Sequence, residues 1–268
     1  MLRAMYSGIS GLKNFQSKLD VVGNNIANVN TFGYKKGRVT FKDLVSQQVG
    51  SASGGNGLTA GGINPKEVGL GGTMATVDNV YNQGAMQNSG RALDVGISGE
   101  GFFAVNVNGQ TQYTRAGNFY TDNAGDLVNG DGAYVLGTGG AKITIPAGAK
   151  SLSIGKDGQV SYVNAAGAST DVGQIQVVTF ANNAGLSKVG ANNYIQSQNS
   201  GAPSGPAAGN IPGTNGRGEL VSGALEMSNV DLSEEFTEMI IAQRGFQANT
   251  RIITTSDEIL QELVNLKR

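Results

Sequence analysis

The chain of 268 residues contains no cysteine, no histidine and no tryptophan, and only five prolines. Without cysteine it has no disulfide, no thiol nucleophile and no thiolate metal site. Without histidine it has no Ser-His-Asp triad and no imidazole ligand. These absences exclude most hydrolase and metalloenzyme classes. We therefore expect a protein that is not an enzyme and that binds no cofactor and no metal.

Long apolar runs are also missing. No stretch approaches the roughly eighteen residues needed to cross a bilayer, and residues 1–30 mix polar and apolar residues where a signal peptide has an unbroken apolar core. The net charge is −1, and the basic residues near the N-terminus have no aromatic platform beside them. We expect a soluble chain with no cleavable signal peptide, no membrane insertion and no nucleic-acid partner.

What the chain does have is an apolar stripe at its N-terminal end. The stripe recurs at steps of three and four, as on one face of an α-helix, and part of it repeats every seven residues, as in a coiled coil. Gly33 can adopt the left-handed conformation that ends a helix, so the helical segment is expected to span residues 1–33. The predicted face consists of Leu2, Met5, Ile9, Leu12, Phe15, Leu19, Val22, Ile26 and Val29.

A second stripe lies at the C-terminal end, in residues 229–268. Asp231 is a good N-cap, with Glu234 three residues on as in a capping box. The segment 231–268 holds seven acidic and four basic residues, whereas 1–42 holds seven basic and one acidic, so the two ends attract each other. The predicted face consists of Leu232, Phe236, Met239, Phe246, Ile253, Leu260 and Leu263.

Between the stripes the chain is rich in glycine, with 42 in total, about twice the ordinary usage. Residues 34–83 are expected to form an extended Gly/Ser-rich linker that begins with a short strand at 34–42. Residues 84–228 contain short β-prone runs separated by turn signals such as Asn108-Gly109, with a Gly/Pro-rich loop at 199–218. The predicted fold is therefore α+β and multidomain: terminal helices in a coiled coil, and a central all-β barrel or sandwich.

Three motifs could carry chemistry, and each has a simpler explanation. The glycines of GNGLTA (55–60) fit a loose dinucleotide fingerprint but follow no strand and open no helix. Asp122, Asp126 and Asp131 fail the calcium-loop pattern and suit ordinary turns. Asp94 and Glu100 could be paired carboxylates, but no cleft is in view.

Both predicted helices also carry small residues away from the main stripe: Ala4, Gly8, Gly11, Ala242, Gly245 and Ala248. An interior helical glycine costs about 1 kcal/mol, so a second close helix contact would explain them. Burial within one pair of helices is small against the entropy of ordering them. We expect the ends to be largely unfolded in the monomer and to become helical on self-assembly.

A short echo links the two borders of the β region. Gly223-Ala224-Leu225-Glu226-Met227-Ser228 is similar to Gly84-Ala85-Met86-Gln87-Asn88-Ser89. The match is short enough to be coincidence. The alternative is that the two segments lie side by side where the chain enters and leaves the β domain.

Four segments, taken together, resemble the axial rod and hook proteins of the bacterial flagellum. They are LDVVGNNIANVNTFGYKKGRVTFKD (19–43), RALDVGISGEGFFAV (91–105), YTRAGNFYTDNAGDLVNGDGAYVLG (113–137) and LEMSNVDLSEEFTEMIIAQRGFQANTRIITTSDEILQELVNLKR (225–268). Within this family the chain looks most like a short hook protein, through FGYKKGRVTFKD and SDEILQELVNLKR. The distal rod protein shares these motifs and has a linker of similar length.

The resemblance implies a helical tube, with terminal helices forming an inner coiled-coil layer and the β domain an outer layer. As a hook subunit the chain would form a homopolymer that acts as a flexible universal joint, passing torque from motor to filament. Its partners would be the distal rod, the hook–filament junction proteins, the hook cap and the flagellar type III export apparatus. Its location would be extracellular, in the flagellar hook or basal body. The other hypotheses are a distal rod protein, a secreted self-associating adhesin and, least of all, a carboxylate-based glycosidase.

Overall fold

The computed structural model describes residues 2–54, 61–205 and 209–266. Contacts divide the chain into two compact units. The helical unit comprises Met1–Ala27, Gly37–Asp78 and Asp231–Arg268, and the β unit comprises Asn28–Lys36 and Asn79–Val230. The GNGLTA segment and part of the 199–218 loop lie outside the described residues.

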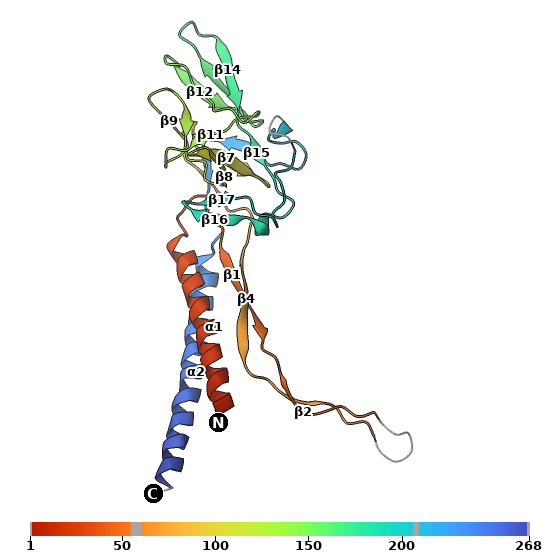
Figure 1. Ribbon diagram of the computed structural model, residues 1–268. Coiled ribbons are helices and arrows are strands. Elements are labelled where there is room, and N and C mark those ends of the chain that lie inside the picture. The colour runs from red at the N-terminus through yellow and green to blue at the C-terminus, as the bar shows by residue number, and fades with distance from the viewer. Residues whose placement is uncertain (1, 55–60, 206–208, 267–268) are drawn as a thin grey trace. The chain divides into compact units, whose positions relative to one another are not determined.

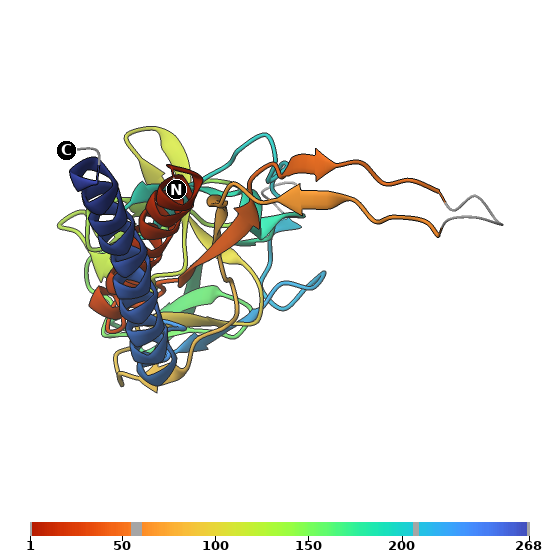
Figure 2. The ribbon, with the colours of Figure 1, turned by 90° about the horizontal axis from the view of Figure 1, so that it is seen from below.

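Two long helices form the centre of the helical unit. α1 (Leu2–Ala27) and α2 (Leu232–Asn265) lie side by side and run antiparallel (Figures 1 and 2). Asp231 caps α2 as predicted, because its side chain accepts a hydrogen bond from the Ser233 backbone N–H at 2.8 Å. This pairing by itself does not confirm a coiled coil, because the seam between the helices differs from the predicted heptad seam, as described below.

The first helix ends earlier than predicted. It stops at Ala27, and residues 28–33 form turns that begin with a hydrogen bond from Thr31 N to Asn28 O at 3.1 Å. Asparagine favours such turns over the helix interior, which explains why the helix stops at the Asn-rich stretch. Gly33 does adopt the left-handed conformation, with φ at 69°, but it lies in the β unit rather than at the helix end. Val29 therefore does not belong to the helix face.

The segment expected to be a linker contains four strands of the helical unit. β1 (Gly37–Asp43) pairs with β4 (Gly72–Asn79), and β2 (Gln47–Gly50) pairs with β3 (Lys66–Val68). Gly71, just before β4, lies against α1: a Cβ there would be 2.3 Å from the Ser10 Oγ. In Figure 2 the β2–β3 hairpin extends away from the helices. The residues of β2 and β3 are exposed apart from the half-buried Gly50.

The β unit is built on an eight-stranded sheet, and smaller sheets complete it (Figure 1). The main sheet has the order β16 (Ser187–Gly190), β17 (Asn193–Ile195), β8 (Gln110–Thr114), β7 (Phe102–Val107), β11 (Tyr134–Val135), β10 (Leu127–Val128) and β9 (Tyr120–Thr121), with β15 (Val177–Val178) also on β7. The others are β12 (Ser151–Ile154), β13 (Gln159–Val163) and β14 (Ser169–Gln174); β6 (Val95–Ser98) with β18 (Glu219–Ser222); and β5 (Met86–Asn88) with β19 (Ala224–Glu226). One 3₁₀ turn, η1, spans Asn183–Gly185.

The prediction of a barrel is wrong. Among the described strands, the outermost two of the main sheet, β16 and β9, do not pair with each other, so the sheet stays open. β9, β10, β11 and β15 are only two residues long. Such short pairs cannot continue the staggered ladder that closing a barrel requires.

The core of the β unit lies on both faces of β7. Phe103 and Val105 belong to a cluster with Phe119, whereas Phe102 and Ala104 belong to a second cluster with Tyr113. Side chains alternate between the faces of a strand, and a strand buried on both faces reads as a continuous apolar run. The FFAV sequence is therefore the centre of the fold. The Asn108-Gly109 turn joins β7 to β8 as predicted, with φ at 50° and 86°.

Candidate functional site: the helix faces and the neck

The seam between α1 and α2 is made of small and polar residues of α2. Ala242 is fully buried, and Glu235 and Ser256 are buried on the same side. A Cβ at Gly245 would be 2.4 Å from the ring of Phe15, and one at Gly8 would be 3.4 Å from Ile253. The glycines thus let the two backbones approach closely. The small residues are therefore part of the contact between α1 and α2, together with some of the predicted heptad residues such as Phe15 and Ile253.

Polar contacts complete this seam. Asn25 donates to the Glu235 carboxylate at 3.0 Å, and Lys18 forms an ion pair with Glu238. The side-chain amide of Asn249 packs against Gly11, since a Cβ at Gly11 would be 2.8 Å from Asn249 Nδ2. The same Nδ2 donates to the Gly245 carbonyl at 3.0 Å. Buried polar pairs set the register of two helices more strictly than apolar contacts do.

The predicted assembly residues divide into three groups. On α1 the side chain of Val22 is buried, those of Met5, Leu12, Phe15, Leu19 and Ile26 are half-buried, and that of Ile9 is exposed. On α2, Met239, Ile253 and Leu260 are half-buried, whereas Leu232, Phe236, Phe246 and Leu263 are exposed. The side chain of Leu2 lies outside the described part of the chain, and Val29 lies beyond the helix.

Exposed apolar side chains flank the seam of α2 on both sides. At 100° per residue, Phe236, Ile240 and Phe246 lie on one side of Ala242 and Asn249, and Ile252, Ile259 and Leu263 lie on the other. Phe236 is 50% exposed and Ile240 is 57% exposed. Several exposed large apolar side chains on one helix favour an interaction site. We name these six residues the α2 flanks.

In the β unit, the segments next to the chain crossings meet in a structure that we name the neck: residues 33–36, 80–84 and 226–229. β5 and β19 pair beside it, with Leu225 opposite Gln87 and Glu226 opposite Met86. This confirms that the two echoing segments lie side by side. The echo is therefore a usable sequence signal, although its short length made coincidence an equal explanation.

Two buried charged side chains of the neck, Lys35 and Glu226, form a cluster with Arg115, next to β8 of the adjacent sheet. Glu226 accepts from the Lys35 ammonium at 2.7 Å and from the Arg115 Nε at 2.8 Å. Lys35 and Glu226 are each 1% exposed. Burial is the largest influence on both groups: it lowers the pKa of Lys35, and for Glu226 it opposes the two cations, which together hold the carboxyl pKa below its ordinary value. Sequence analysis missed these residues, because three charges so far apart in the chain carry no local pattern.

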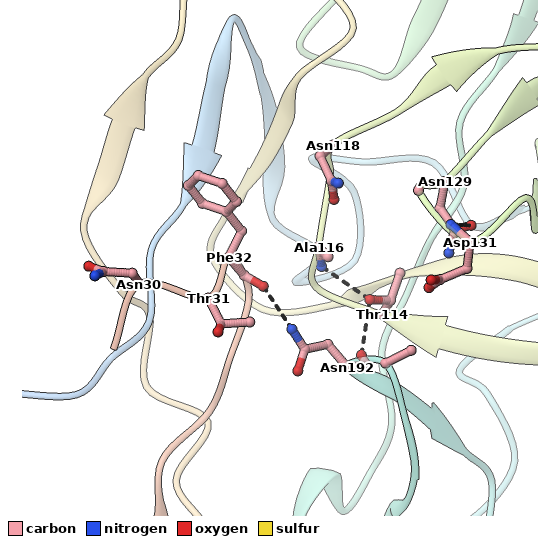
Figure 3. A pocket seen from close by; sticks show the side chains of 11 residues that line it. Asn30, Thr31, Phe32, Thr114, Ala116, Asn118, Asn129, Asp131 and Asn192 are labelled. Atoms are coloured by element: carbon pink, nitrogen blue, oxygen red, sulfur yellow. Dashed lines mark hydrogen bonds between the residues drawn. The ribbon is translucent and has the colours of Figure 1, made fainter. Parts of the chain in front are cut away.

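The β unit also has a polar pocket of about 380 Å³ (Figure 3). Its wall is formed by the exit segment 30–32 and by the ends of the neighbouring strands. Asn192 Nδ2 donates to the Phe32 carbonyl at 3.1 Å, and Thr114 Oγ1 donates to the Asn192 carbonyl at 3.0 Å. These bonds fasten residues 30–32 to the sheet. Asp131 lines this pocket, away from Asp126, whose carboxylate is bound by Lys142 and Thr144.

No group of three or more potential acidic, histidine or cysteine ligands is placed to hold a metal within the described residues. Nor does any described helix have the length and apolar character to span a membrane. Asp94 forms an ion pair with Arg91 at 3.0 Å.

Comparison with known proteins agrees with this architecture. Family models match at residues 5–35 (flagella basal body rod protein), 96–162 (flagellar hook protein FlgE/F/G D1 domain) and 221–266 (flagellar basal body rod FlgEFG protein C-terminal). A relative in Bacillus subtilis (strain 168), named flagellar basal-body rod protein FlgG, is 60% identical over 268 residues, and the alignment covers all of both chains. The chain belongs to the flagellar rod and hook protein family.

Other members of the family are more distant. The flagellar basal-body rod protein FlgG of Borreliella burgdorferi is 37% identical over 274 residues, with both chains fully covered. The flagellar hook protein FlgE of Treponema pallidum is 29% identical over an alignment of 469 positions, again with both chains fully covered. The matches at 5–35 and 221–266 include the helices of this family member and parts of its neck.

Proposed function

We propose that the protein is a structural subunit of the flagellar basal-body rod, in the distal part of the rod. The observation that carries this proposal is the 60% identity to a rod protein along the whole of both chains. The hook interpretation from the sequence has weaker support. The hook relative matches at 29% over 469 positions, far more than the 268 residues available here.

Assembly is assigned to the terminal helices. The α2 flanks supply apolar surface on both sides of a seam that α1 already occupies, so one helix pair can contact two neighbours. Fully burying each such side chain contributes roughly 1.5–3 kcal/mol. The occupant of the flanks is a second copy of this chain, and the predicted face residues of α1 and α2 serve the same contacts. The product is a helical homopolymer continuous with neighbouring axial proteins.

Export completes the proposal. The subunit leaves the cytoplasm through the flagellar type III apparatus without a cleaved signal peptide and assembles in the basal body. A rod subunit has no need of enzymatic chemistry. As part of the axial structure, the polymer transmits torque toward the hook.

Deletion of the chain in its own bacterium tests the rod assignment. We expect non-motile cells whose basal bodies, in electron micrographs, have a truncated rod and no hook. A complete rod without a hook would instead identify a hook subunit, and intact motility would favour an adhesin. Persistence length measured on tubes of purified protein gives a second test, since a rod subunit should form stiff tubes and a hook subunit flexible ones.

Complementation with a point variant tests the role of the helices. Phe246→Asp should abolish polymerisation while the β unit stays folded, because Phe246 is exposed on an α2 flank and leaves the seam intact. Thr255→Asp adds the same charge at an exposed polar residue that lies outside both α2 flanks, and should assemble. Leu12→Asp and Ile253→Asp should also fail to assemble. Assembly of Phe246→Asp would refute the contact.

A further inference from the structure

The chain passes between the two units four times, and three of these passages border the neck. Lys36 is the last residue before the passage into β1, Asn79 is the first after β4, and Val230 is the last before α2. Any load carried by the chain from one unit to the other along these passages therefore reaches the segments 33–36, 80–84 and 226–229.

Glu226 bonds to each of the other two segments. Its Oε1 accepts from the Lys35 ammonium at 2.7 Å and from the Gly84 N–H at 2.9 Å, and its backbone carbonyl accepts from the Gly33 N–H at 2.8 Å. Its Oε2 accepts from the Arg115 Nε at 2.8 Å. Glu226, in segment 226–229, thus ties segments 33–36 and 80–84 together.

Arg115 anchors this cluster to the sheet. Its Nη1 donates to the Gly101 carbonyl at 2.6 Å and its Nη2 to the Gly99 carbonyl at 2.9 Å, next to the start of β7. Lys35 also donates to the Asn82 carbonyl at 2.8 Å. The core strand of the β unit is therefore bonded, through Arg115 and Glu226, to all three segments of the neck.

Asn229 makes a second set of links between the same segments. Its Oδ1 accepts from the Lys36 N–H at 2.8 Å, and its Nδ2 donates to the Val80 carbonyl at 2.7 Å. Val80 N donates directly to the Lys36 carbonyl at 2.9 Å. These links are uncharged, so they hold the segments independently of the ion pairs.

Two glycines bring the backbones close enough for these bonds. A Cβ at Gly84 would lie 2.1 Å from the Met227 carbonyl oxygen, and one at Gly33 would lie 2.6 Å from the Ala116 nitrogen. Gly33 also needs its positive φ of 69°. A side chain at Gly84 would push residues 80–84 away from residues 226–229, and one at Gly33 would push residues 33–36 away from Arg115 and Ala116.

We infer that the neck is a rigid joint: Glu226 and Asn229 lock three chain passages into one body, so that the passages cannot swivel independently where they leave the β unit. Loss of a single partner is costly here, because it leaves the other buried charges of the cluster uncompensated. The role of this joint in torque transmission rests on the proposed function. The rigidity itself does not depend on it.

Spin-label distance measurement on the polymer tests the joint directly. The chain has no cysteine, so cysteines introduced at Asn82 in the neck and Ser169 on β14, both exposed and both in the β unit, label specifically. In polymers containing a small fraction of labelled subunits, we expect a narrow distance distribution for the parent chain. Glu226→Gln should broaden it at least twofold, and Glu219→Gln, at an exposed glutamate on β18, should leave it unchanged.

Hydrogen exchange adds a readout of folding. In Glu226→Gln the amides of Gly33 and Gly84 should exchange at least tenfold faster, while those of β7 keep their protection. If Glu226→Gln fails to fold, Asn229→Ala removes the side-chain hydrogen bonds of Asn229 without stranding a charge and should also broaden the distribution. An unchanged distance distribution in a folded variant would overturn the joint. Truncated or complete rods in the deletion strain answer the separate question of rod or hook.

Discussion

The two units of this protein use apolar residues in opposite ways. In the β unit the large apolar side chains are inside: Phe103, Phe119 and Val105 are fully buried. In the helical unit the buried positions of α2 are Glu235, Ala242 and Ser256, while phenylalanines and isoleucines are exposed. The β unit has its own complete core. The helical unit has an internal seam, and the α2 flanks stay exposed within the single chain.

The largest expected contrast is in hydrogen exchange of the monomer. Amides of β7 and β8 should be at least about a thousandfold more protected than those of residues 5–29, because core amides open only with the whole domain. The helices should gain protection on assembly, as their marginal burial predicts. Exchange measured by mass spectrometry on monomer and polymer checks this. Strong protection across 5–29 in the monomer would contradict it.

The next largest contrast is in the stability cost of truncating a phenylalanine to alanine in each unit. Phe103→Ala should cost about 3–5 kcal/mol, because the ring is fully buried and meets Phe119 edge-on at 5.0 Å. Phe246→Ala should cost clearly less than Phe103→Ala in the monomer, since its side chain is already 37% exposed. Urea unfolding of the monomer measures both. Equal costs would mean that the α2 flanks are covered within one chain.

Within the helical unit, two glycine-to-alanine changes test how closely α1 and α2 pack. Gly245→Ala should destabilise the helix pair by about 1–3 kcal/mol, because its Cβ would lie 2.4 Å from the Phe15 ring. Gly8→Ala is the matched control: its Cβ would meet Ile253 at 3.4 Å, so the change should stabilise the helix by up to about 1 kcal/mol. Thermal unfolding of the polymer, followed by circular dichroism, should move in opposite directions for the two variants.

The smallest expected effect is a pH dependence of the neck. The folded-state pKa of Glu226 lies below its ordinary value of 4.5, so the carboxylate's contribution is fully present above pH 4.5 and is lost as the pH falls through the lowered pKa. The difference in unfolding free energy between the parent chain and Glu226→Gln should therefore be constant from neutral pH to 4.5 and shrink below it. A difference that shrinks already above pH 4.5 would show a raised pKa instead.

Much of the local structure could be predicted from the sequence. The cap at Asp231, the Asn108-Gly109 turn and the apolar run of β7 all follow from neighbouring residues, and the structure confirms them. The predicted end of the first helix, at Gly33, lies six residues beyond the observed end at Ala27. Gly33 is the stronger stop signal in the sequence, but the asparagines before it already favour turns and end the helix earlier. The strands within 37–79 were missed in part because exposed, glycine-rich strands have little apolar alternation.

The candidate site divides in the same way. Periodicity alone identified which residues of the two ends are apolar and share a face, and the echo of residues 84–89 in 223–228 pointed to the paired segments of the neck. The family resemblance, too, rests only on sequence. The tertiary structure decided which face of α2 meets α1, because close backbone approach favours Ala242 and Gly245 over the larger heptad residues. It alone revealed the Lys35–Glu226–Arg115 cluster, since burial and pairing of distant charges arise only when the chain is folded.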